Sequence, residues 1–138
     1  MEKREQLLDV LKDMIPYVKG ILVYGSFIKG YEDVKSDIDI CVIEKEGIES
    51  KVLYERVLKV SADDRYDIVI FNRIPWYLRG EILENNAVIY AEDEDDLDFW
   101  LYKQLKIWNG MKRRLQLVSA DDLIARAEEG RLKKDPLT

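Results

Sequence analysis

The chain has 138 residues, a formal net charge of −6, a sequence pI of about 4.8 and no histidine. This acidic balance argues against general nucleic-acid binding, which needs a basic face. The missing histidine excludes histidine triads and histidine metal sites. The single cysteine, Cys41, allows neither a disulfide framework nor a zinc site, so we expect a reducing, cytoplasmic setting. The charged amphipathic start is no signal peptide, and no apolar run is long enough to span a membrane.

Helices and strands alternate along the first two thirds of the sequence. Apolar residues recur at helical spacing in residues 3–15, 49–60 and 74–85, which predicts three helices. Runs rich in β-branched and aromatic residues predict strands at 19–25, 37–44, 65–72 and 87–91. The expected fold class is α/β (α+β), with a small mixed β-sheet backed by helices.

A long helical stretch is expected after the acidic run at residues 92–98. Its apolar residues follow each other in steps of three and four, from Leu97 through Trp100 and Trp108 to Val118. Ser119 looks like an N-cap that opens a last helix. We therefore expect a domain at residues 1–93 and a helical C-terminal extension at 94–138. The extension could pack on its own sheet, form a homodimer or contact a partner protein.

Two carboxylates stand inside an apolar strand. Asp37 and Asp39 point the same way, with Cα atoms about 6.6 Å apart, while Ile38, Ile40 and Val42 face the opposite side and can pack. Such a pair can bracket two cations about 3.5–4 Å apart, and hard oxygen ligands suit Mg²⁺ or Mn²⁺. Asp67, at the start of the next strand, could complete this metal site or accept a proton from an attacking hydroxyl.

A glycine–serine pair ends the strand upstream. Gly25 permits unusual dihedral angles and lets the backbone approach a phosphate. Ser26 would open a helical turn whose free N–H groups favour phosphate oxygens. Lys29 could add positive charge there or be a solvated surface lysine. Ser36 could contact phosphate, although turn formation explains it equally well.

Gly25-Ser26, ten residues and then Asp37-Ile38-Asp39 resemble the signature of the nucleotidyltransferase superfamily related to DNA polymerase β. The short chain looks most like the minimal nucleotidyltransferase (MNT) group, over about residues 5 to 93. The resemblance implies a polymerase β palm-like fold and Mg²⁺-dependent transfer of a nucleoside monophosphate, such as AMP from ATP, to a hydroxyl. Many relatives carry arginine where this chain has Lys29.

Roles for the site residues follow from the same resemblance. It implies that Asp37 and Asp39 hold two metal ions, that Asp67 holds the ion that activates the acceptor, and that Gly25 and Ser26 hold the β and γ phosphates. Some MNT proteins are antitoxins that transfer AMP to a tyrosine of a HEPN-domain ribonuclease. Others modify aminoglycosides, usually with an extra domain for which this chain lacks room.

We therefore expect a protein adenylyltransferase that could serve as the antitoxin of a HEPN/MNT pair. Two alternatives stay open. The chain could be a catalytically vestigial module that neutralises its partner by contact, or a small-molecule nucleotidyltransferase that shares an acceptor pocket between two subunits.

Overall fold

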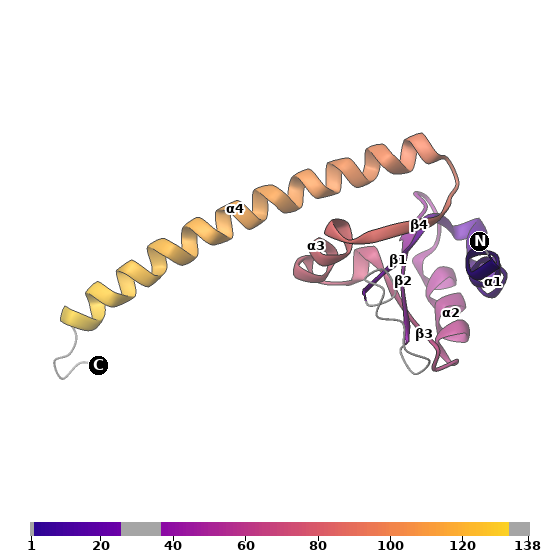
Figure 1. Cartoon of the computed structure of the whole chain (residues 1–138), viewed down its shortest axis with the longest axis horizontal. Coiled ribbons are helices and arrows are strands. Elements are labelled where there is room, and N and C mark those ends of the chain that lie inside the picture. Colours follow the sequence, from indigo (N-terminus) through magenta and orange to yellow (C-terminus); the bar gives the residue numbers. More distant parts are fainter. Residues whose placement is uncertain (1, 26–36, 133–138) are drawn as a thin grey trace.

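The computed structural model describes residues 2–25 and 37–132 and has a four-stranded mixed sheet at its centre (Figure 1). The strands lie in the order β3-β2-β1-β4. Strand β1 is antiparallel to both of its neighbours, and β2 is parallel to β3. The strands are β1 (Val18–Tyr24), β2 (Ile38–Glu44), β3 (Tyr66–Ile70) and β4 (Asn86–Ala91). The predicted mixed sheet is confirmed.

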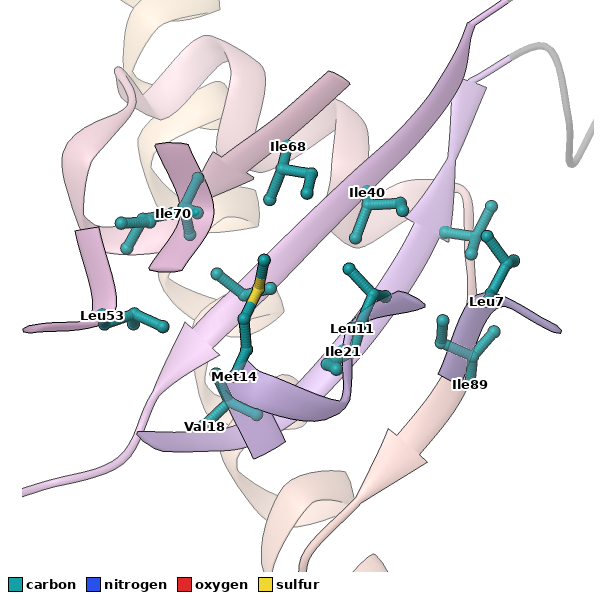
Figure 2. Close-up of a cluster of buried hydrophobic side chains, with 13 residues drawn as sticks. Leu7, Leu11, Met14, Val18, Ile21, Ile40, Leu53, Ile68, Ile70 and Ile89 are labelled. Carbon is teal, nitrogen blue, oxygen red and sulfur yellow. The ribbon is translucent and has the colours of Figure 1, made fainter. Parts of the chain in front are cut away.

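One face of the sheet is covered by α1 (Glu2–Val10), the 3-10 helix η1 (Lys12–Tyr17) and α2 (Ser50–Ser61). Figure 2 shows Leu7, Leu11 and Met14 lying against isoleucines of the strands. The helix predicted at residues 3–15 is therefore shorter as an α-helix and continues as η1. Pro16 lies inside η1, near its end, where it cannot donate a backbone hydrogen bond.

The other face is covered by the short 3-10 helix η3 (Phe71–Arg73), by α3 (Trp76–Glu84) and by the first part of α4 (Glu94–Leu132). Here Trp108 lies directly on Gly80: a Cβ atom at Gly80 would stand 2.0 Å from the indole ring. The indole nitrogen of Trp108 donates a hydrogen bond to Glu84 at 3.2 Å, and Lys112 pairs with the same carboxylate. These contacts fix α4 on α3.

Helix α4 is continuous over 39 residues, so the predicted break at Ser119 is wrong. A serine followed by acidic residues opens a helix only where the preceding backbone leaves the helical conformation. No glycine or proline between Gly110 and Gly130 makes the backbone do so. Figure 1 shows the distal half of α4 reaching far beyond the sheet and its other helices. None of the helices in the described ranges is long and apolar enough to cross a membrane.

Candidate active site

Four residues form a row across one end of the sheet. Strand pairing places Asp67 opposite Asp39, Asp39 opposite Tyr24, and Tyr24 opposite Asn86. Residues paired in this way project from the same face of a sheet. Asp37 immediately precedes β2 and is exposed. Asp39 and Asp67 therefore meet as the sequence predicts, next to a tyrosine that sequence reasoning did not select.

The alternation of β2 and β3 decides which way the aspartates point. Ile40 and Val42 belong to the core cluster beneath α1 and α2, as predicted. The aspartate face is not simply open, however, because two residues further on Cys41 and Ile43 are buried beneath α3 and α4. Both faces of β2 thus become core, and Asp39 lies where the second core cluster begins. Cys41 is fully buried in this second cluster.

The alternation of side chains along β3 favours Asp67 over its acidic neighbours as the residue that lies beside Asp39. Ile68 and Ile70 pack in the first core cluster, while Val69 packs against the second, on the side of Asp67. Asp63, an acid four residues before Asp67, instead accepts hydrogen bonds from the backbone N–H of Arg65 at 3.0 Å and from the Arg65 guanidinium at 2.7 Å. The side-chain hydrogen bond from Arg65 is the main cause that lowers the pKa of Asp63 to about 2. Asp63 therefore serves the turn before β3.

Gly25 lies beside Asp39, in a space that has no room for a side chain. Its φ of +78° lies in the left-handed region that glycine adopts without strain. A Cβ atom at this position would lie 2.4 Å from Oδ2 of Asp39. The position of Gly25 at a strand end predicts close approach of its backbone to a phosphate. The structure adds a second reason for glycine, which is that the Asp39 carboxylate occupies the space beside it.

The carboxylates influence each other. Partial burial raises the pKa of Asp39 above its usual value, and the neighbouring Asp67 and Asp37 carboxylates raise it further. Within residues 2–25 and 37–132, the ion pairs of the lysines and arginines involve other acids. Among the described residues, no ion pair compensates the negative charge of these carboxylates, and negative charge attracts cations.

The donor set suits a hard divalent cation in its chemistry, since it offers carboxylate oxygens and no histidine. A bound cation would favour the ionised form of Asp39, whose pKa burial and the neighbouring carboxylates raise. In the part of the chain that the structure describes, however, no group of three or more acidic, histidine or cysteine side chains is gathered closely enough to hold a metal ion. Metal binding by Asp37, Asp39 and Asp67 therefore stays a prediction.

Tyr24 is the site residue that sequence analysis missed. Its side chain is buried in the second core cluster, and its phenol pKa is raised, first by burial and then by the Asp39 carboxylate. The phenol is therefore neutral at physiological pH, and its O–H group is able to donate a hydrogen bond. The only sequence signal was its position, directly before Gly25 at the end of an apolar run.

Three predicted nucleotide-binding residues, Ser26, Lys29 and Ser36, lie outside the described residues. Their roles stay predictions.

The fold and the row of acids at a sheet end are those of a nucleotidyltransferase. The family model "Polymerase beta, Nucleotidyltransferase" matches residues 5–95. The chain belongs to this polymerase β-type nucleotidyltransferase family, and the predicted family and fold class are confirmed.

Two relatives extend the comparison. The chain is 39% identical over 99 residues to MJ1547, a candidate protein adenylyltransferase of Methanocaldococcus jannaschii, and the match covers 72% of this chain and 76% of the relative. It is 22% identical over 122 residues to the protein adenylyltransferase MntA of Shewanella oneidensis, which covers 87% and 86% of the two chains.

Solved structures share the fold. A chain of a toxin–antitoxin crystal structure with AMP-PNP aligns with a TM-score of 0.66 at 22% identity, over 87% of this chain and 98% of its own length. A second match, with a TM-score of 0.62 at 20% identity, comes from a tri-AMPylated Shewanella oneidensis HEPN toxin in complex with its MNT antitoxin and covers 89% and 99% of the two chains.

Proposed function

We propose that the chain transfers AMP from ATP to a hydroxyl group of a partner protein, and that the partner is a HEPN-type toxin which this modification neutralises. The observation that carries the proposal is the pairing of Asp39 with Asp67 beside Gly25, at one sheet end of a chain in the nucleotidyltransferase family. The adenylyltransferase names of two relatives, and the toxin–antitoxin complexes among the structures of the same fold, support the acceptor class.

The residues of the site take separate roles in this proposal. Asp37, Asp39 and Asp67 would hold Mg²⁺, as two ions, or Mn²⁺. When bound, such ions supply positive charge to the triphosphate and to the group that leaves. Gly25, Ser26, Lys29 and Ser36 would contact the nucleotide. Tyr24 pairs with Asp39 across the strands and would border the site on its buried side.

The transfer itself is a displacement at the α-phosphorus. The acceptor oxygen bonds to this phosphorus, the bond to the bridging oxygen breaks, and pyrophosphate leaves with the bonding electrons. The hydroxyl proton needs an acceptor at that moment. Asp67 is suited to this role, because its side chain is exposed at the sheet end and lies next to Asp39. We place this reaction in the cytoplasm, where the free thiol of Cys41 stays reduced.

Incubation with α-³²P-labelled ATP and Mg²⁺, with and without the product of the adjacent gene as the candidate partner, tests the proposal. We expect label on that protein and a loss of at least 100-fold in the Asp39→Asn variant. Asp13→Asn, a neutralised acid in η1, is the matched control and should keep the wild-type rate. Label on a small molecule, or on nothing while the partner is still neutralised, would favour the alternatives and refute this proposal.

A further inference from the structure

Helix α4 has two faces with opposite environments. On the inward face, Trp100, Leu105 and Trp108 pack in the second core cluster. A helix turns about 100° per residue, which places Lys106 and Arg113 on the opposite, outward side. Tyr102 flanks this pair on one edge, and Lys103, Ile107 and Arg114 flank it on the other. These six residues are called the outward face.

The outward face is apolar as well as charged. Tyr102 is 60% exposed and Ile107 is 47% exposed, and Phe99, one turn earlier, is 58% exposed. Two hollows lie side by side on it. One of about 450 Å³ is lined by Tyr102, Lys106 and Arg113, among others, and one of about 480 Å³ by Lys103, Ile107 and Arg114. Exposed apolar side chains around hollows are typical of interaction surfaces.

The charge of the outward face opposes that of the whole chain. Between Asp98 and Asp121 the sequence has five basic residues and no acidic one, although the chain carries a net charge of −6. Lys112 is used internally, in its ion pair with Glu84. The other four basic side chains of this stretch all lie on the outward face. This surface is therefore complementary to an acidic one.

Gly110 forms a notch between the two hollows and lines both of them. Glycine inside a helix destabilises it relative to alanine. At Gly80 the chain itself needs that space, because Trp108 fills it. At Gly110 nothing lies within 4 Å of where a Cβ atom would stand. The described residues thus give no internal reason for this glycine, and its position allows close approach from outside.

We propose that the outward face of α4 is the docking surface for the acceptor protein, whose carboxylates meet the four basic side chains and whose apolar side chain enters the notch at Gly110. The identity of the acceptor rests on the proposed function, but the surface and its chemistry rest on α4 alone. Docking here would hold the acceptor on the helix that packs against the α3 side of the sheet, which is the face that carries Asp39 and Asp67.

Two other occupants fit the surface less well. A second copy of the chain in a symmetric dimer would place the same basic face against itself, which like charges oppose. Nucleic acid would satisfy the basic groups but would leave the exposed Phe99, Tyr102 and Ile107 without apolar partners. Acidic runs at residues 94–96 and 121–122 also bound the basic stretch on both sides and would repel a phosphate backbone.

Calorimetric titration of the full chain with the protein that accepts the label in the transfer experiment tests the docking surface. The Lys106→Glu/Arg113→Glu variant should bind at least tenfold more weakly. The matched control Lys51→Glu/Lys59→Glu reverses two exposed charges on α2 and should bind within twofold of wild type. Gly110→Leu should also weaken binding tenfold while the melting temperature stays equal or rises, because leucine favours a helix over glycine.

The kinetics separate this proposal from the proposed function. The Lys106→Glu/Arg113→Glu variant should raise the KM for the partner and leave kcat at saturation unchanged. Asp39→Asn should abolish transfer and leave binding of the partner intact. If Lys106→Glu/Arg113→Glu or Gly110→Leu binds the partner as tightly as wild type, the docking surface is overturned, even if AMP transfer is confirmed. Two other results would also overturn it. One is a wild-type homodimer, seen in sedimentation, that the Lys106→Glu/Arg113→Glu variant no longer forms. The other is binding of a labelled single-stranded RNA that this variant loses while it still binds the partner protein.

Discussion

Asp39 is the residue in which stability and function conflict. It lies between the Asp67 carboxylate and the buried Tyr24, with the backbone of Gly25 against its oxygen. Burial and two neighbouring carboxylates raise its pKa, so its ionisation is less favourable in the folded chain than in the unfolded one. Such a cost at a single position is typical of a site that is arranged for a ligand rather than for folding.

This cost has a defined pH dependence. A carboxyl whose pKa is raised by folding stabilises the protein most below its unfolded pKa, and that contribution is lost as pH rises through the folded pKa. In metal-free buffer, Asp39→Asn should therefore have a higher melting temperature than wild type at pH 7, and the difference should shrink as pH falls through the raised folded pKa and vanish below the unfolded value of about 4. Thermal denaturation across pH measures it, and an equal gain at all pH values would contradict the charge origin.

Divalent cations should act on the same residue. If Asp39 belongs to a metal site, Mg²⁺ should raise the melting temperature of the wild type at pH 7, since a ligand that binds only the folded state stabilises it. Removal of the ion with EDTA should reverse the gain, and Asp39→Asn should show little of it. An identical Mg²⁺ response in both proteins would place the ion elsewhere.

Gly25 can be tested against a second glycine of nearly the same backbone conformation. Gly25→Ala should lose about 1–2 kcal/mol to the left-handed dihedral alone, and it should also lose AMP transfer because its Cβ atom would displace the Asp39 carboxylate. Gly47 has a φ of +81° and open space around its Cβ position. Gly47→Ala should therefore lose similar stability and keep transfer, and loss of transfer in both variants would contradict the contact argument.

At the scale of elements, the strands were predictable because their apolar runs are short and bounded by turn residues. Asp67 could be chosen over Asp63 from its phase in β3, and the structure pairs it with Asp39. Tyr24 could not be chosen, because a tyrosine in an apolar run looks like core until its neighbour across the sheet is known. The prediction that only one face of β2 packs was also incomplete, since α3 and α4 cover the other face beyond Asp39.

Trp108 attaches α4 to α3, because its ring occupies the space above Gly80. Trp108→Ala should lower the free energy of unfolding by about 3–5 kcal/mol, as expected for a buried tryptophan. Tyr102→Ala, on the outward face of the same helix, should change it by less than about 0.5 kcal/mol. Urea denaturation compares them, and an equal loss in both variants would contradict the two-faced description of α4.

Seen as a whole, the molecule is a small two-faced sheet domain with one helix that extends far past it (Figure 1). Met111 is the last side chain of α4 that packs against the second core cluster among the described residues. A chain that ends after Gln116 should therefore keep its free energy of unfolding within about 0.5–1 kcal/mol. A larger loss in urea denaturation would show that the distal half of α4 stabilises the domain.

The length of α4 could not be read from sequence, because Ser119 followed by two acids is an N-cap signal as well as an ordinary exposed helical turn. Which of the two forms depends on whether the preceding helix stops, and the residues before Ser119 do not stop it. The sequence was sufficient for the family, because Gly25-Ser26 and Asp37-Ile38-Asp39 at their spacing are its signature. It was not sufficient for the outward face, which depends on which side of α4 packs.

The central claim is that the chain neutralises its partner by transferring AMP to it, which requires Asp37 and Asp39, and not by binding alone. The most direct measurement compares wild type with Asp37→Asn/Asp39→Asn for three quantities: affinity for the HEPN-domain partner, AMP transfer to it and relief of its toxicity in growing cells. We predict wild-type affinity, no transfer and no relief of toxicity in the double variant. Relief of toxicity without transfer would contradict the claim and leave a binding module with a vestigial site.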